Sequence, residues 1–333
     1  MNFWRTLRRF FSGQVGREPD ELAQALTRHR AAFGGAMIQI RAFYAFLLFV
    51  VINDVPLWWF LFGKSNFVSI WPTAWVPAVG LSTGVALIQY FALATACLAI
   101  LLPQWRWVRI AFFIGILEYV ALKSSYGKIG HSGHLGVLVA FCLIFLPAGW
   151  HRLSSSRLVQ RRTLLTFWSA QALVLLTYTM AGLGKIGGAL WQMSRGEAHA
   201  FLPDALALHI ADRLLQTNAR SPLGEFLIEH PVLAWPGMLA AIFLQAFALW
   251  IAFRPRLMPV WATGLIVFHL LSYFTMTIIF PQNCFLLALF FLYPVWRRDP
   301  WDWRRAIRDL PLFGPWLVRV PGLRPKPVPA CAS

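Results

Sequence analysis

The sequence predicts an all-α polytopic membrane protein, and three observations lead to this fold class. Hydrophobic residues make up 58% of the chain and charged residues only 13%, whereas about a quarter of the residues in a soluble protein are charged. Apolar stretches of about 20 residues, the length of a helix that crosses a bilayer, recur along the chain. Lysine and arginine are abundant in every second connecting segment, which is typical of loops on opposite sides of a membrane.

We expect about eight transmembrane helices, because the chain holds that many apolar runs bounded by charged residues, proline or glycine. In chain order, the expected helices are Ile38–Phe62, Leu81–Leu102, Val108–Leu122, Leu135–Trp150, Thr163–Leu183, Val232–Phe253, Leu257–Ile278 and Cys284–Trp296.

These helices divide the chain into three regions. Residues 1–37 form a basic segment that is cytoplasmic or lies at the membrane interface. Residues 38–296 form the transmembrane domain, with one larger outer loop at 186–230. Residues 297–333 form a basic, proline-rich cytoplasmic tail.

The positions of the basic residues predict the orientation of the chain. Arginines fill the N-terminal segment, the alternate loops and the C-terminal tail, which places both termini in the cytoplasm. This asymmetry also accounts for the net charge of +17 without a nucleic-acid partner. The expected partner is the lipid bilayer, and the expected location is the bacterial plasma (inner) membrane. Of the 30 Lys and Arg residues, those on the opposite side are Lys64, Lys123, Lys128, Lys185, Arg195, Arg213 and Arg220.

Lys185 is the sharpest functional clue, because it is the only charged residue between Thr163 and Gln192. A lysine at the edge of the hydrocarbon layer extends its amine to the interface, finds a partner or loses its proton. The first outcome is purely structural, and the last would make Lys185 a base. Gly182 and the glycines that follow would let a helix or a flat ligand approach closely.

Other polar residues within or beside the expected helices have a structural and a functional interpretation. Asp54, Glu118 and His269 lie inside spans, where ionisable groups usually face the bundle interior, either in an interhelical hydrogen bond or in a cavity. His131 and His134 form an HxxH pattern for which we expect an acid–base or hydrogen-bonding role. We expect no metal site, because the segment is rich in glycine and no HExxH pattern is present.

Three segments carry a resemblance to a known family. The first is Tyr178-Thr-Met-Ala-Gly182-Leu-Gly-Lys185-Ile186 with Trp191 downstream. The second is His131-Ser132-Gly-His134-Leu135. The third is Phe268-His269-Leu270 followed by Ile278-Ile279-Phe280-Pro281. In order and spacing, they resemble blocks of the horizontally transferred transmembrane (HTTM) domain family, which includes the vitamin K-dependent gamma-carboxylases.

The resemblance implies a site and a cofactor. In gamma-carboxylases, the lysine of the first block deprotonates reduced vitamin K, and a histidine of the second block assists carboxylation. Lys185 would therefore be the catalytic base, with His131 or His134 as the second catalytic residue; Ser132 favours His131. The implied cofactor is a reduced, vitamin K-like quinone. Candidate residues of an outer-leaflet cavity for it are Tyr178, Gly182, Trp191, His269, Glu118 and Asp54.

Two residues depart from the family pattern. Gln245 stands where relatives carry an acidic residue, and Ile279 stands where the block has glycine. The expected function is a carboxylase-like enzyme, or a quinol-dependent lyase or oxidoreductase, that modifies a peptide or a small substrate at the outer leaflet. The alternative is a non-catalytic maturation or export factor for a secreted peptide, which would bind the outer loop at 186–230. A transporter is less favoured, because the chain has no internal repeat.

Overall fold

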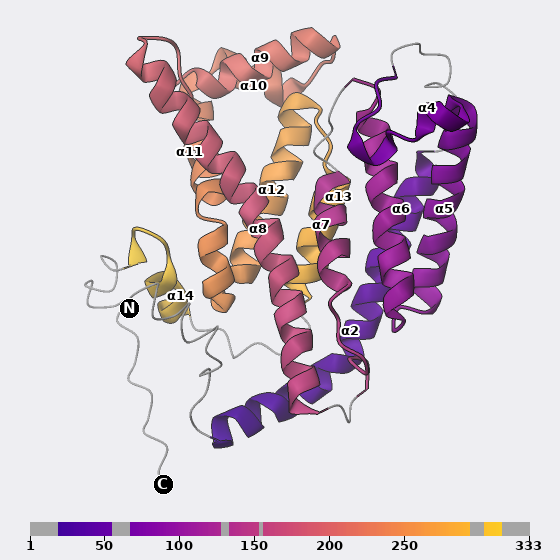
Figure 1. Ribbon diagram of the computed structural model, residues 1–333. Coiled ribbons are helices and arrows are strands. Elements are labelled where there is room, and N and C mark those ends of the chain that lie inside the picture. The colour runs from indigo at the N-terminus through magenta and orange to yellow at the C-terminus, as the bar shows by residue number, and fades with distance from the viewer. Residues whose placement is uncertain (1–18, 55–66, 128–132, 153–155, 294–302, 315–333) are drawn as a thin grey trace, which may run out of the picture.

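The computed structural model describes residues 19–54, 67–127, 133–152, 156–293 and 303–314 (Figure 1). Within these residues every regular element is helical, which confirms the all-α class. Consecutive long helices run in opposite directions between the two ends of the molecule, and two short helices of the segment that follows α8 lie across one end. His131 falls outside the described residues, as do positions 55–62 of the first expected span and 294–296 of the eighth.

Figure 1 labels the helices in chain order. The α-helices are α2 (Pro19–Asn53), α4 (Val76–Val79), α5 (Leu81–Leu101), α6 (Arg106–Ser124), α7 (His134–Leu143), α8 (Arg157–Ser194), α9 (Ala205–Thr217), α10 (Pro222–Glu229), α11 (Pro231–Ala246), α12 (Met258–Met276), α13 (Pro281–Leu287) and α14 (Trp303–Asp309). Shorter turns are the 3₁₀ helices η1 (Trp71–Thr73), η3 (Leu249–Phe253) and η4 (Pro255–Leu257) and the π-helix η5 (Ala288–Leu292).

Several of these helices are long and apolar enough to cross a membrane. Four described segments meet both conditions, namely Gly35–Asn53, Leu81–Leu101, Leu158–Ser194 and Met258–Met276. Helices α10 and α11 add a fifth if they count as one broken span, since they meet at a bend of 108°. Pro231 starts α11 at this bend, where its ring fits a first helical turn but could not continue α10.

Helix α8 extends well beyond its expected end at Leu183. The glycines after Leu183 are poor helix formers, but no proline interrupts the helix before Ser194, and propensity alone rarely ends one. The helix ends at Ser194, and Gly196 terminates it with a left-handed φ of 69°. There the amides of Gly196 and Glu197 donate to the carbonyls of Met193 and Gln192, which is the Schellman arrangement. The loop expected from residue 186 therefore begins only after Ser194.

Two other expected spans are shorter as regular helices. Helix α7 ends at Leu143, ahead of Pro147, consistent with the bias of a residue before proline against helix. Helix α11 ends at Ala246, and the chain continues as η3. At this break the amide of Leu249 donates to the hydroxyl of Thr179 on α8, 2.8 Å away. A side chain on the neighbouring helix thus replaces a lost intrahelical acceptor.

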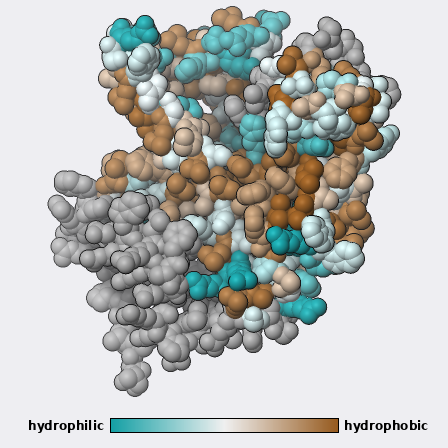
Figure 2. All heavy atoms as spheres, in the orientation of Figure 1, coloured by the Kyte–Doolittle hydropathy of each residue, from teal (hydrophilic) through white to brown (hydrophobic). Residues whose placement is uncertain are grey.

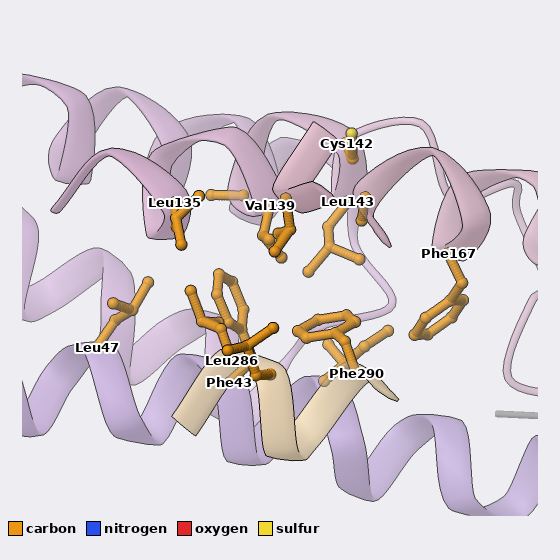
Figure 3. Packing of buried hydrophobic residues seen from close by; sticks show 14 of the residues in the cluster. Phe43, Leu47, Leu135, Val139, Cys142, Leu143, Phe167, Leu286 and Phe290 are labelled. Carbon is orange, nitrogen blue, oxygen red and sulfur yellow. The ribbon is translucent and has the colours of Figure 1, made fainter. Parts of the chain in front are cut away.

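The hydrophobic core joins the two ends of the chain. Phe43 and Leu47 of α2 point toward Leu135 and Val139 of α7, while Phe290 of η5 packs between them and α8 (Figure 3). The rings of Phe43 and Phe290 meet edge to face, with centroids 6.0 Å apart. This contact brings the first and last apolar helices of the described chain together.

Two buried glutamines account for the freed carbonyls of the π-helix. A π-turn leaves carbonyl groups outside the usual α-helical pattern. The amide nitrogen of Gln39 donates to the carbonyls of Leu289 and Tyr293 at 2.5 and 3.1 Å. The amide nitrogen of Gln171 donates to the carbonyl of Phe290 at 2.6 Å. These bonds fix α2 and α8 to the last apolar segment without placing a charge in the core.

Candidate functional site

Lys185 lies on α8 and makes a direct contact with α11. Its Nζ donates a hydrogen bond of 2.8 Å to Oε1 of Gln245, a side chain in which only 4% of the surface is exposed. The residue that departs from the family pattern is therefore the immediate partner of the candidate base. An amide oxygen accepts a hydrogen bond from an amine or an ammonium, but it supplies no negative charge. Within the described residues, Lys185 has no carboxylate partner.

Gly182 fixes the distance between α8 and α11 at this contact. A Cβ added at Gly182 would lie 2.3 Å from the backbone nitrogen of Ala246, which no real Cβ tolerates. Only glycine permits this crossing, and the crossing sets Gln245 beside Lys185. Gly184 and Gly187 differ, because a Cβ at either position would meet nothing within 4 Å. The glycines of this segment were expected to admit either a helix or a flat ligand. At Gly182, the close neighbour is helix α11.

Lys185 lines a cavity of about 870 Å³. Ligand sites commonly have volumes of about 300–1,000 Å³ and mostly apolar walls with a few polar groups. Figure 2 shows a hollow beneath the end of the molecule that α9 and α10 cover. The apolar residues of the walls include Ala189, Leu206, Leu223, Leu227, Leu233, Met238, Phe268, Leu271 and Phe280, and the polar or charged ones include Lys185, Gln192, His199, Asp204, His209, Arg213, Ser272 and Thr275.

Helices α9 and α10 form the roof of this cavity and are attached to the end of α12. The hydroxyl of Ser221 caps α10 by accepting a bond from the amide of Gly224, and it donates to the carbonyl of Phe274 on α12. A Cβ on Gly224 would lie 2.3 Å from the carbonyl oxygen of Thr275. The roof thus contacts α12 in two places, through the hydrogen bond of Ser221 and through the close backbone approach at Gly224.

Tyr178 and His269 form a buried pair next to the cavity wall. The Tyr178 hydroxyl and Nε2 of His269 are 2.7 Å apart, and the two side chains are 5% and 4% exposed. The His269 ring contacts Phe268 and Phe280, which line the cavity, with centroids 5.1 and 4.8 Å away. Nδ1 of His269 is buried and has no hydrogen-bond partner in the described part of the chain. Two candidate residues from different motifs are therefore in direct contact.

Asp54, the residue after α2, and Glu118 of α6 have their partners elsewhere in the structure. Asp54 accepts bonds from the Tyr119 hydroxyl at 2.9 Å and from Nζ of Lys123 at 2.5 Å. Glu118 accepts a bond of 3.2 Å from the indole of Trp75. We name these five residues the α2–α6 polar cluster. They do not line the Lys185 cavity.

The remaining candidates are more peripheral. His134 begins α7, where Gly133 packs closely against Val120 of α6. Trp191 is 63% exposed, and the Arg195 guanidinium lies over its ring, 5.5 Å from the ring centroid. Neither His134 nor Trp191 lines the cavity. Among the residues that the structure describes, no group of three His, Cys, Asp or Glu side chains could hold a metal ion.

Sequence reasoning did not select the residues of the cavity roof. His199, Asp204, His209 and Arg213 fall within the outer loop expected at 186–230. Their residue types indicate titratable and charged groups on the outer face, but not a shared cavity. The available signal was the amphipathic pattern of α9, with Ala207, Ile210 and Leu214 buried on one face. That pattern predicts a surface helix, but it does not reveal what the helix covers.

The helices and the site together define a polytopic all-helical protein with spans apolar and long enough for a membrane, and with an apolar cavity that contains a lysine. In comparisons of the chain with known proteins, no family model, no curated protein and no solved structure gave a match.

Proposed function

We propose that the protein is an integral protein of the bacterial inner membrane, with about eight spans and both termini in the cytoplasm. Two observations support this topology. Consecutive long helices alternate in direction (Figure 1), and basic residues are concentrated in alternate connecting segments. Under this topology the Lys185 cavity, α9 and α10 lie at the outer leaflet.

We further propose that the cavity binds a quinol-like lipid and that Lys185 acts on it as a base. The observation that carries this proposal is the position of Lys185, which lines an apolar cavity of about 870 Å³ and has a neutral amide as its partner. A quinol ring with an apolar tail suits such walls. The neutral amine of Lys185 would take the proton of a quinol hydroxyl, which gives a quinolate and an ammonium held by Gln245.

The HTTM resemblance supports the same role for Lys185 and a reduced, vitamin K-like quinone as the cofactor. The later chemistry would then be carboxylase-like, or that of a quinol-dependent lyase or oxidoreductase, on a peptide or small substrate. A histidine partner is proposed from the same resemblance, at His131 or His134. His269, which is hydrogen-bonded to Tyr178, packs against Phe280 of the cavity wall and so helps to hold that wall in place.

The proposal is tested first by extraction of lipid from the purified protein. A bound quinone or quinol is expected in the wild type. Purified protein is then supplied with vitamin K hydroquinone and dioxygen as the oxidant, and oxidation of the quinolate is followed by absorbance against a blank without protein. The expected result is that Lys185→Ala abolishes consumption while the protein still inserts and unfolds at the wild-type temperature.

Lys123→Ala is the matched control, because Lys123 is also a lysine on an apolar helix but belongs to the α2–α6 polar cluster. It is expected to retain consumption of the quinol. If Lys185→Ala loses folded protein to the same extent as it loses quinol consumption, Lys185 is instead a structural residue. Peptide maturation that persists in Lys185→Ala would favour a non-catalytic maturation or export factor for a secreted peptide.

A further inference from the structure

The outer end of the Lys185 cavity carries a second cation on a different wall. Arg213 projects from α9, which forms part of the roof, whereas Lys185 belongs to α8. Nε of Arg213 is buried and has no hydrogen-bond partner in the described residues. A guanidinium is always charged and matches the geometry of carboxylate and phosphate groups. A buried donor of this kind without an acceptor is costly unless a ligand supplies one.

The acidic groups near Arg213 do not fill this role. Asp204 is the carboxylate among the residues that line the cavity, but it stands nine positions earlier, about 13 Å along the helix axis. Asp212 faces Gln216, from which it accepts a bond of 2.8 Å. Glu225 and Glu229 on α10 form no ion pair with Arg213 in the described part of the chain. The Nε of Arg213 is thus left without an acceptor beside the mostly apolar cavity.

The apolar residues of the other walls indicate the chemistry of the rest of the ligand. Leu223 and Leu227 of α10, Leu233 and Met238 of α11 and Leu271 of α12 all line the same cavity. Apolar walls of this extent favour a hydrocarbon chain, because burial stabilises by roughly 25 cal/mol per Å² of apolar surface. The cavity therefore combines a cationic group on its roof with walls that are mostly apolar.

We propose that the cavity binds an amphiphile with an anionic headgroup, whose carboxylate or phosphate contacts Arg213 and whose chain lies among α10, α11 and α12. The inference concerns the cavity of the proposed function but does not require Lys185 to act as a base. A ligand of this class would occupy the same volume as the quinol-like lipid and would compete with it.

Binding to the purified full-length protein in detergent tests the proposal with two matched pairs of probes. Oleate is compared with oleyl alcohol, and dioleoylphosphatidylglycerol is compared with dioleoylphosphatidylcholine, so each pair shares its chain and differs in net charge. Wild-type protein is expected to bind the anionic member of at least one pair about tenfold more tightly. Preference within the first pair identifies a fatty carboxylate, and preference within the second identifies a phospholipid headgroup.

Arg213→Gln is expected to remove this preference and leave binding of the neutral or zwitterionic probes unchanged. Arg213→Lys retains the charge and is expected to retain most of the preference. Arg220→Gln is the matched control, because Arg220 is an exposed arginine outside the cavity lining. Wild-type protein without an anion preference, or an equal loss in Arg213→Gln and Arg220→Gln, would overturn the proposal.

Lys185→Gln separates this inference from the proposed function. If Lys185→Gln leaves consumption of the quinol intact, the base assignment fails. The preference that depends on Arg213 is still expected in that variant. If the preference is absent while Lys185→Ala abolishes consumption, the anion site fails and the base assignment stands.

Discussion

The α2–α6 polar cluster and the Lys185 cavity hold ionisable side chains on apolar helices in two different ways. In the cluster, Lys123 lies 2.5 Å from a carboxylate oxygen of Asp54, which Tyr119 also contacts. At the cavity, Lys185 contacts the neutral amide of Gln245 and faces empty volume. Lys123 is in the last turn of α6, whereas Lys185 lies nine residues before the end of α8. The difference in partner and surroundings makes Lys185, and not Lys123, the candidate base.

The largest expected effect comes from the helix crossing that creates the Lys185 site. Gly182→Ala places a methyl group against the backbone of Ala246, so α8 and α11 must separate. Overpacking of this kind destabilises by about 1–3 kcal/mol. Gly184→Ala is the matched control: with open space around its Cβ, it is expected to be neutral or stabilising by up to about 1 kcal/mol. The thermal midpoint of unfolding in detergent is measured for both variants. Equal midpoints would show that the close contact of Gly182 with Ala246 does not contribute to stability.

The next largest effect is expected from making the Lys185 site resemble the polar cluster. Gln245→Glu would put a carboxylate beside Lys185, as Asp54 is beside Lys123. The carboxylate favours the ammonium form, which cannot accept a proton. Consumption of vitamin K hydroquinone is expected to fall at least tenfold at neutral pH and to recover as the pH rises. Gln245→Met, which keeps the length but removes the acceptor of Lys185, is expected to lower consumption without recovery at higher pH. Unchanged profiles in both variants would contradict the base assignment.

A smaller effect is expected from weakening the ion pair of the polar cluster. Asp54→Asn keeps an acceptor for the Tyr119 hydroxyl but removes the charge opposite Lys123. The two charged side chains are 23% and 33% exposed, and partly exposed pairs contribute about 1 kcal/mol or less. The thermal midpoint is therefore expected to fall by a few degrees, while consumption of the quinol remains. Loss of consumption without loss of stability would move Asp54 into the functional site.

The smallest effect is expected at the edge of the polar cluster. Trp75→Phe removes the indole donor to Glu118 and keeps an aromatic ring in place. A single hydrogen bond to a partly exposed group contributes about 0.5 kcal/mol, the low end of the usual range. Guided by that value, we expect a small decrease in the thermal midpoint and normal quinol binding. A large loss of quinol binding in this variant would show that the two regions are coupled.

The sequence predicted several elements well because their signals are local. The apolar runs that became α5 and α12 end near charged residues or turn-forming residues, so their bounds differ from the expected ones by only one or two positions. The end of α8 was missed because a glycine-rich stretch resembles a loop, while the first strong stop is the left-handed Gly196. The break after Ala246 was missed for another reason: Thr179 of a different helix stabilises it.

The candidate site was predictable only in part. Lys185 and the motif around Tyr178 could be selected, since a lone charge in an apolar stretch is visible in the sequence. The contact of Tyr178 with His269 joins residues 91 positions apart, and the roof residue Arg213 is defined by a cavity that five helices line. Neither the Tyr178–His269 contact nor the position of Arg213 at the cavity produces a periodic or compositional pattern in the sequence.

The sequence by itself determined that this is an all-helical chain with membrane-length apolar segments and one isolated lysine, because hydropathy and charge are properties of single residues and short windows. Only the tertiary structure decided what that lysine meets. Its partner lies at the point where Gly182 lets the backbones of α8 and α11 approach closely. Its cavity is lined by helices that are distant in the chain. Such contacts follow from how the helices pack together, so no local pattern could specify them.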